Sequence, residues 1–372
     1  MYHMRVKTTL VKRVAAMTTV ALFPLALLGC SGHDQSALGQ SSGNKTQTLA
    51  TGQPDSATSD TSVPLNFKTS EFGPEAFPED RGLYWEDMYW YDEESIPLVV
   101  PLDNDVEGKM TDENGVLIVN WPGYDEPVYH PVEMALYGLG AYKAYEHTQD
   151  SVYLQRAEAN AQAIVDGSEE VDGALWFPYA FPHTLHTDDS MTLQPPWYSG
   201  MAQGLALDLF SKLCSATESS YWCEESDKTF GSFLQTNLPD QSFAWVDQDD
   251  HLWLEEYVGN IPATQVINGH IYAALGLAEY ARLTGNEAAI EMFNGAATTV
   301  IDTFEDYRVP GGLSYYCAAD YCAETEWQPE NYHYGVSRQF RVLGHLTDMP
   351  EFVEMQQTFS EDLKAHQEAQ ED

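Results

Sequence analysis

The chain has 372 residues, 43% of them apolar, which is enough for a buried core in one large or two small domains. It carries 17 lysine and arginine residues against 58 aspartate and glutamate residues, for a formal net charge of -41. A surface of this charge repels phosphate backbones, which excludes nucleic acid as a partner.

The N-terminus has the pattern of an export signal. Basic residues precede an apolar run over residues 14–28, followed by Gly29 and Cys30. The run is too short to span a membrane comfortably, and its end resembles the bacterial lipobox. We therefore expect a lipoprotein signal over residues 1–29, a lipid anchor on Cys30 and export to a bacterial membrane. Ser31 favours the outer membrane or cell surface, and an ordinary secretory signal is the alternative.

Four further cysteines remain after Cys30. Disulfides persist in exported proteins, and four cysteines allow three pairings. Pairing of neighbours is favoured, that is Cys214 with Cys223 and Cys317 with Cys322. The spacings fit no common zinc motif, so we expect no metal at these residues.

Between the signal and the main domain, two segments differ in composition. Residues 30–75 are polar and are predicted to form a disordered tether. Residues 76–128 contain aromatic clusters and two strand-like runs, 96–101 and 116–121. The Asn-Gly pair that lies between these runs, at 114–115, is typical of a β-hairpin turn.

From residue 129 to residue 372 the sequence has helical periodicity and an internal repeat. Four apolar-periodic segments each end in threonine plus a turn, and a second helix-like segment follows. The threonines are Thr148, Thr217, Thr284 and Thr347, which are 69, 67 and 63 residues apart. Such pairs bury both faces only by packing side by side. The repeat predicts a mainly α fold, an α/α toroid of about four antiparallel helix pairs, with long aromatic loops at one end.

Candidate functional residues occur in and near these loops. They form three groups, at 195–204, at 253–257 with 267–272, and at 311–316 with 331–333. In the first group Gly200 and Gly204 permit close approach, and Gln203 offers two donors and an acceptor. Helix packing through small residues is the alternative interpretation of that group.

Taken together, these clusters resemble the C-terminal catalytic domain of the D-glucuronyl C5-epimerases, which convert glucuronate to iduronate within a polysaccharide. The matching stretches are 129–139, 197–204, 255–257 with 266–269, 312–315 and 332–333, in the order of the family. The resemblance implies an α/α toroid, in agreement with the repeat, without the β-sandwich that the animal enzymes insert. It also implies an isomerase acting on an acidic polysaccharide, with no cofactor.

The resemblance assigns catalytic roles to Glu256, Tyr257, Tyr315 and Tyr332, with Tyr316 replacing Tyr315 if the register shifts by one. Two positions depart from the family. Ala318 stands where an arginine is usual, and Val336 stands where a second histidine is usual. Arg338 is a candidate replacement for that arginine. The residues expected to bind substrate are His333, Arg338, Gln203, Asn268, Trp197, Tyr198 and Tyr316.

Inversion at C5 removes a proton next to a carboxylate and returns one to the other face, which needs two acid–base groups on opposite sides of the ring. We therefore expect Tyr315 and Tyr332 on opposite walls of one cleft, with Glu256 and Tyr257 at its floor. A polyuronate lyase would begin with the same abstraction. A glycoside hydrolase would need a second carboxylate opposite Glu256. A non-catalytic glycan-binding lipoprotein is the remaining alternative.

Overall fold

The computed structural model describes residues 66–70, 100, 102 and 110–371. The predicted signal, the anchor at Cys30 and most of the tether lie outside these residues. The tether prediction is wrong at 66–70. The Phe67 ring packs against the main core, and the backbone N–H of Ser70 donates to Thr298 Oγ1 at 2.8 Å. One partly buried aromatic ring thus ties this otherwise polar stretch to the core.

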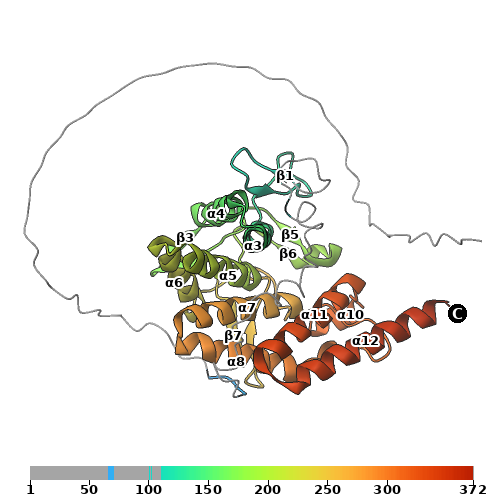
Figure 1. Cartoon of the computed structure of the whole chain (residues 1–372). Helices are drawn as coiled ribbons and strands as arrows, with labels where there is room; N and C mark the ends of the chain where they lie inside the picture. The colour runs from blue at the N-terminus through green and yellow to red at the C-terminus, as the bar shows by residue number, and fades with distance from the viewer. Residues whose placement is uncertain (1–65, 71–99, 101, 103–109, 372) are drawn as a thin grey trace, which may run out of the picture. The chain divides into compact units, whose positions relative to one another are not determined.

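Residues 110–371 form four helix pairs, and the two helices of each pair are joined by two residues (Figure 1). The pairs are α3 (Pro131–Thr148) with α4 (Ser151–Asp166), α5 (Gly200–Thr217) with α6 (Ser220–Leu234), α7 (Ile267–Thr284) with α8 (Glu287–Asp302), and α11 (Glu330–Thr347) with α12 (Pro350–Glu371). The short helices α9 (Phe304–Tyr307) and α10 (Asp320–Glu324) lie between the last two pairs.

The predicted threonine repeat is confirmed, and the structure gives its physical cause. The first helix of each pair has 18 residues and ends at Thr148, Thr217, Thr284 or Thr347. Each threonine hydroxyl donates to the carbonyl four residues earlier, at 2.6–2.8 Å. The next residue adopts a left-handed conformation. A left-handed residue at this position ends a helix and turns the chain back.

The first helices of the pairs pack in chain order, α3 on α5, α5 on α7 and α7 on α11, while each also packs on its own partner. Their faces enclose two large clusters of buried apolar residues. Helix pairs arranged side by side in this way form the α/α toroid that the repeat predicts.

The loops that lead into α5 and α7 carry small antiparallel hairpins, two before α5 and one before α7. They are β3 (Glu169–Val171) with β4 (Ala174–Trp176), β5 (His183–Thr184) with β6 (Thr192–Leu193), and β7 (Ala244–Val246) with β8 (Leu252–Leu254). The loops before α5, α7 and α11 also pair with one another, because Tyr198 bridges to Val258 and Val266 bridges to Cys317. The loops therefore meet at one end of the toroid, as predicted. This is the end at which α5, α7 and α11, the inner helices of their pairs, begin.

The predicted N-terminal hairpin forms with a different first strand. β1 (Met110–Thr111) pairs with β2 (Leu117–Ile118) around the expected Asn-Gly turn. The Asp112 carboxylate caps this turn by accepting the N–H groups of Asn114 and Val116, both at 2.9 Å. The second strand falls within the predicted run 116–121. Most of the other run, 96–101, lies outside the described residues.

Both predicted disulfides are present, Cys214–Cys223 and Cys317–Cys322. The first ties the end of α5 to α6. The second closes a short loop directly after Tyr316. Among the described helices, none is long and apolar enough to cross a membrane.

Candidate functional site

Four of the predicted residues come together where the loops meet. The hydroxyls of Tyr257 and Tyr316 lie 3.0 Å apart. The ring of Tyr332, in the first turn of α11, stands edge-on to the Tyr316 ring with centroids 4.5 Å apart. Glu256 interacts electrostatically with all three tyrosines. We call Glu256, Tyr257, Tyr316 and Tyr332 the acid–base cluster.

Burial controls the protonation of this cluster. Removal of the Glu256 carboxyl from water raises its pKa to about 8, although hydrogen bonding by the Tyr257 and Tyr316 hydroxyls offsets part of the rise. Burial raises the pKa of Tyr332 to about 12 and those of Tyr257 and Tyr316 well above 10. Near neutral pH the cluster therefore holds neutral phenols beside a carboxyl group that gains and loses a proton easily.

The chain makes room for Glu256 through a glycine. A Cβ atom at Gly269, in the first turn of α7, would lie 2.1 Å from Glu256 Oε2. That oxygen is buried and has no hydrogen-bond partner among the described residues. The preceding residue, Glu255, is used differently, because its carboxylate accepts from Thr264 Oγ1 at 2.7 Å and from the backbone N–H of Gln265 at 3.0 Å. Glu255 thus fixes the loop, whereas one carboxyl oxygen of Glu256 has no partner among the described residues.

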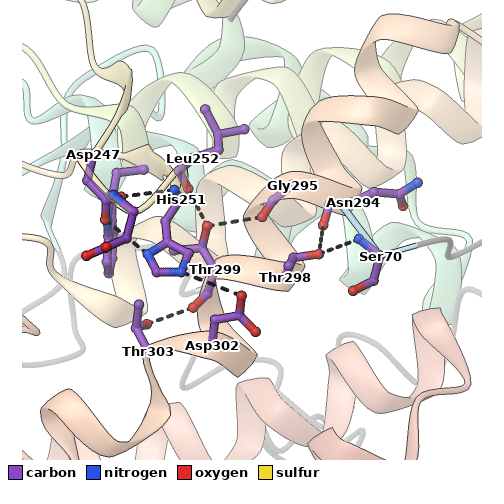
Figure 2. A network of polar contacts seen from close by, with 12 residues as sticks. Ser70, Asp247, His251, Leu252, Asn294, Gly295, Thr298, Thr299, Asp302 and Thr303 are labelled. Carbon is purple, nitrogen blue, oxygen red and sulfur yellow. Dashed lines mark hydrogen bonds and ion pairs between the residues drawn. The ribbon is translucent and has the colours of Figure 1, made fainter. Parts of the chain in front are cut away.

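The hairpin that delivers Glu256 is anchored on α8 by polar contacts (Figure 2). Thr299 Oγ1 donates to the Leu252 carbonyl of β8 at 2.8 Å. The imidazole of His251 lies between Asp247, at 3.1 Å, and Asp302, at 3.5 Å. These contacts hold β8 against α8, and they thereby fix the position of the residues that follow β8.

Three inner helices support their preceding loops with the same device, which sequence reasoning did not find. In each, the side chain of the fourth helix residue accepts a hydrogen bond from a backbone N–H of the preceding loop. The same side chain donates a hydrogen bond to the second helix of the pair. In α7, His270 Nδ1 accepts from Leu254 N and Nε2 donates to the Ala296 carbonyl, both at 3.0 Å. In α11, His333 Nδ1 accepts from Ser314 N and Nε2 donates to the Phe359 carbonyl, both at 2.9 Å.

In α5 the same position is Gln203. Its Oε1 accepts from Phe177 N at 3.0 Å, and its Nε2 donates to the Ser232 hydroxyl at 2.7 Å and to the Leu175 carbonyl at 2.9 Å. The prediction that Gln203 and His333 bind substrate is therefore wrong. Both side chains are buried, and their polar atoms are already satisfied within the protein. They position the loops instead.

The structure distinguishes Tyr315 from Tyr316 in the loop at 311–316 and favours Tyr316, the alternative assignment. Tyr316, not Tyr315, places its hydroxyl on Tyr257, because neighbouring residues of an extended loop point in opposite directions. Tyr315 is half-buried and packs against the main core and against the small apolar cluster of Tyr316 and the Cys317–Cys322 disulfide. Tyr316 and Tyr332 are in ring contact, so the expectation of Tyr315 and Tyr332 on opposite walls of a cleft does not describe this arrangement.

Trp197 and Tyr198, the two residues before α5 that were predicted to bind substrate, lie in different surroundings. Trp197 stacks on Tyr179 with centroids 3.7 Å apart and lies 6.1 Å from the Tyr257 ring, so it adjoins the acid–base cluster. Tyr198 points elsewhere, because its hydroxyl donates to the carboxylate of Glu169 in β3. Tyr198 therefore braces the hairpin.

The remaining predicted residues, Asn268 and Arg338, line one cavity of about 180 Å³ together with Tyr332. This cavity lies between the N-terminal halves of α7 and α11. Asn268 Oδ1 is buried without a hydrogen-bond partner among the described residues. At the two positions that depart from the family, Ala318 packs against the core and Val336 is buried in α11. Arg338 is thus the guanidinium that borders Tyr332.

Other residues at the site were missed. Tyr179 is close enough to Glu256 for the two to interact electrostatically, and His183 lies 5.5 Å from the Tyr257 ring. Both occur in the aromatic loop at 173–182 and just after it, which the sequence marked only by composition. Within the described part of the chain, no three histidine, cysteine, aspartate or glutamate residues are grouped to hold a metal ion.

Residues 172–361 match the family model described as "D-glucuronyl C5-epimerase C-terminus". Among solved structures, cellobiose 2-epimerase from Bacillus thermoamylovorans is similar at 11% identity and a TM-score of 0.49, over 82% of this chain and 81% of that one. A GH76 α-mannanase from Bacteroides thetaiotaomicron is similar at 11% identity and a TM-score of 0.46, over 68% of this chain and 63% of the mannanase. No curated protein matches the chain.

Proposed function

Because the chain belongs to the D-glucuronyl C5-epimerase C-terminal family, we propose that it inverts C5 of D-glucuronyl residues in an acidic polysaccharide. The observation that carries this proposal is the buried cluster of one carboxyl and three phenols, in which Glu256 has a pKa of about 8. A general acid or base works best when its pKa lies near the working pH. A buried carboxyl group tuned in this way suits abstraction of a weakly acidic C–H proton.

In the forward step, the Glu256 carboxylate takes the C5 proton, and the C–H electron pair moves into the carboxylate to give an enediolate. The Tyr332 hydroxyl then donates its proton to the other face of C5. Glu256 and Tyr332 come from different elements, the loop after β8 and the start of α11, and the proposal places the sugar ring between them with one group facing each side of C5. After this step Glu256 is protonated and Tyr332 is a phenolate, so one proton must pass from Glu256 to Tyr332 before the next turnover.

The hydroxyls of Tyr257 and Tyr316 supply the route for that proton. Their 3.0 Å contact links Glu256, which is hydrogen-bonded to Tyr257, with Tyr316, which is hydrogen-bonded to Tyr332. The proton gained by Glu256 passes along these hydroxyls to the Tyr332 phenolate. One turnover then leaves every group in its starting state, without a cofactor.

The enediolate carries extra negative charge on the substrate carboxyl group, and catalysis requires donors aimed at that charge. Arg338 borders the same cavity as Tyr332 and is our candidate for this role in place of the family arginine. The high net negative charge does not prevent an anionic glycan from approaching in salt, since screening limits repulsion to about 10 Å.

The deciding experiment incubates the protein with heparosan and chondroitin polymers in D₂O. We expect deuterium at C5 and new iduronate signals in the NMR spectrum. A lyase would begin with the same abstraction but would instead produce unsaturated ends that absorb near 232 nm. A protein that binds these polymers but gives neither signal is a glycan-binding protein, and the epimerase proposal fails.

We also propose that the catalytic domain is exported and held at a bacterial membrane by lipid on Cys30. The support is the lipobox-like end of the apolar run together with two disulfides, which persist in oxidising compartments. Globomycin, which blocks cleavage of lipoprotein signals, should cause the uncleaved precursor to accumulate. Substitution of Cys30 by serine should release the protein from the membrane fraction.

A further inference from the structure

Aromatic rings form a wall beside the acid–base cluster, and the chemistry above does not use them. We define the aromatic wall as Trp121, Tyr179, His183 and Trp197. The His183 ring lies 5.8 Å from Trp197 and 5.4 Å from Trp121, as well as 5.5 Å from Tyr257. The wall is therefore continuous with the cluster on the Tyr257 side. Tyr179 and Trp197 are buried, so the rings of the wall that a sugar could reach are the partly exposed Trp121 and His183.

Within the wall, His183 differs from its neighbours in its polar atoms. The indole N–H of Trp197 donates to the Phe181 carbonyl at 2.7 Å, and that of Trp121 donates to the Pro182 carbonyl at 2.9 Å. Tyr179 accepts from the Val132 N–H at 3.4 Å. Neither ring nitrogen of His183 has a hydrogen-bond partner among the described residues, and the side chain is half-buried. It thus combines a fixed ring with an unused N–H.

Positive charge is scarce around the site. Among described residues, Lys212 is held by Asp208 and Glu279, Arg282 also pairs with Glu279, and Arg308 pairs with Asp362. Arg338 borders the Tyr332 side. On the Tyr257 side the candidates are two histidines. The nearer contact to Tyr257 belongs to His183, whereas the Nδ1 of His130 accepts from the Glu133 N–H at 3.4 Å.

We propose that His183 binds the carboxylate of a uronate residue of the glycan, donating its imidazole N–H from the Tyr257 side. This inference rests on the proposed function, because it specifies how the same site selects an acidic sugar. A hydrogen bond from nitrogen to a carboxylate is charge-assisted and stronger than a bond to a neutral hydroxyl. His183 therefore favours uronates over the corresponding neutral sugars.

The test compares binding of two probes, a heparosan hexasaccharide and the same hexasaccharide with its carboxyl groups reduced to alcohols. His183→Phe keeps a ring in the wall and removes the N–H, while His183→Gln keeps a neutral donor. We expect wild type to prefer the acidic probe, and His183→Phe to reduce that preference about 10- to 100-fold. His183→Gln should retain part of it. His345→Phe, at an exposed position near the end of α11, is the matched control.

The outcomes separate the two proposals. If wild type prefers the acidic probe and His183→Phe prefers it equally, the role of His183 is wrong and the epimerase proposal stands. If wild type binds both probes alike, selection of uronates by His183 is overturned, and C5 exchange in D₂O decides the proposed function separately. Should His183→Phe not fold, the imidazole NMR signals of wild-type His183 replace it. They should shift with the acidic probe and stay unchanged with the reduced one, and the reverse result overturns the assignment.

Discussion

The segments that lead into α7 and α11 are supported in the same way and carry different chemistry. Each is held by a histidine in the first turn of its helix, His270 or His333, which accepts a loop N–H and donates to the outer helix. The α7 segment then presents the carboxyl group of Glu256, whereas the α11 segment presents the phenols of Tyr316 and Tyr332. A repeated scaffold thus holds the group that we propose abstracts the proton on one side and the groups that we propose donate protons on the other.

The largest effect should come from the α11 side. Tyr316→Phe removes the hydroxyl that contacts Tyr257 but keeps the ring, so we expect C5 exchange in D₂O to fall by about 10²–10⁴-fold. Tyr315→Phe is the matched control and should retain nearly full activity. If Tyr315→Phe is the inactive variant and Tyr316→Phe is active, the register derived from the structure is wrong for the working enzyme.

On the α7 side, Glu256→Gln should reveal a cost of burial. The pKa of Glu256 is about 8 in the folded protein, against an ordinary value of 4.5. Between these values the unfolded chain releases a proton that the folded protein keeps, so wild-type stability falls as the pH rises. The free energy of unfolding of Glu256→Gln should match wild type below pH 4.5 and exceed it by about 5 kcal/mol above pH 8. Chemical denaturation at several pH values measures this difference, and a constant difference would contradict it.

The contacts by which the fourth helix residue supports its loop can be tested directly, because this residue is glutamine in α5 and histidine in α7 and α11. His333→Leu leaves the Ser314 N–H and the Phe359 carbonyl buried without partners and should lower the free energy of unfolding by about 2–4 kcal/mol. His333→Gln should recover much of that stability and of the activity. Equal loss in both variants, measured by denaturation and C5 exchange, would show that the glutamine and histidine positions are not equivalent.

The smallest difference should appear between the two disulfides. Each closes a short loop, so removal of either by paired Cys→Ser changes should cost about 2–3 kcal/mol of stability. Loss of Cys317–Cys322 should also reduce catalysis, because that bond begins directly after Tyr316. Loss of Cys214–Cys223 should leave kcat unchanged at a temperature where the variant remains folded. Equal kcat in the two variants would contradict this distinction.

Much of the fold could be predicted from the sequence because it depends on local chemistry. Thr148, Thr217, Thr284 and Thr347 end their helices through contacts with the preceding turn, and such contacts recur at a visible spacing. The pairing of cysteines close in sequence is likewise a local matter.

The site was less predictable because it depends on contacts between distant segments. Gln203 and His333 have the residue types of a binding site, and only the positions of Phe177 and Ser314 show that they support loops. The one-residue choice between Tyr315 and Tyr316 depends on which face of an extended segment meets Tyr257. His183 belongs to no motif, and it reaches the site through the pairing of β5 with β6.

The crossing of α5 and α7 has a mechanical consequence. A Cβ atom at Gly204 would lie 2.3 Å from the Ala273 Cα, and one at Gly276 would lie 2.1 Å from the Gly204 carbonyl oxygen. The two backbones are in direct contact, with no side chains between them to act as a deformable layer. The contact between α7 and α11 is far less extensive, and it borders the cavity at Tyr332. If the toroid opens to admit a polymer, α7 and α11 should therefore be the helices that move apart. Glu256 and Trp197 should then move together as one rigid body.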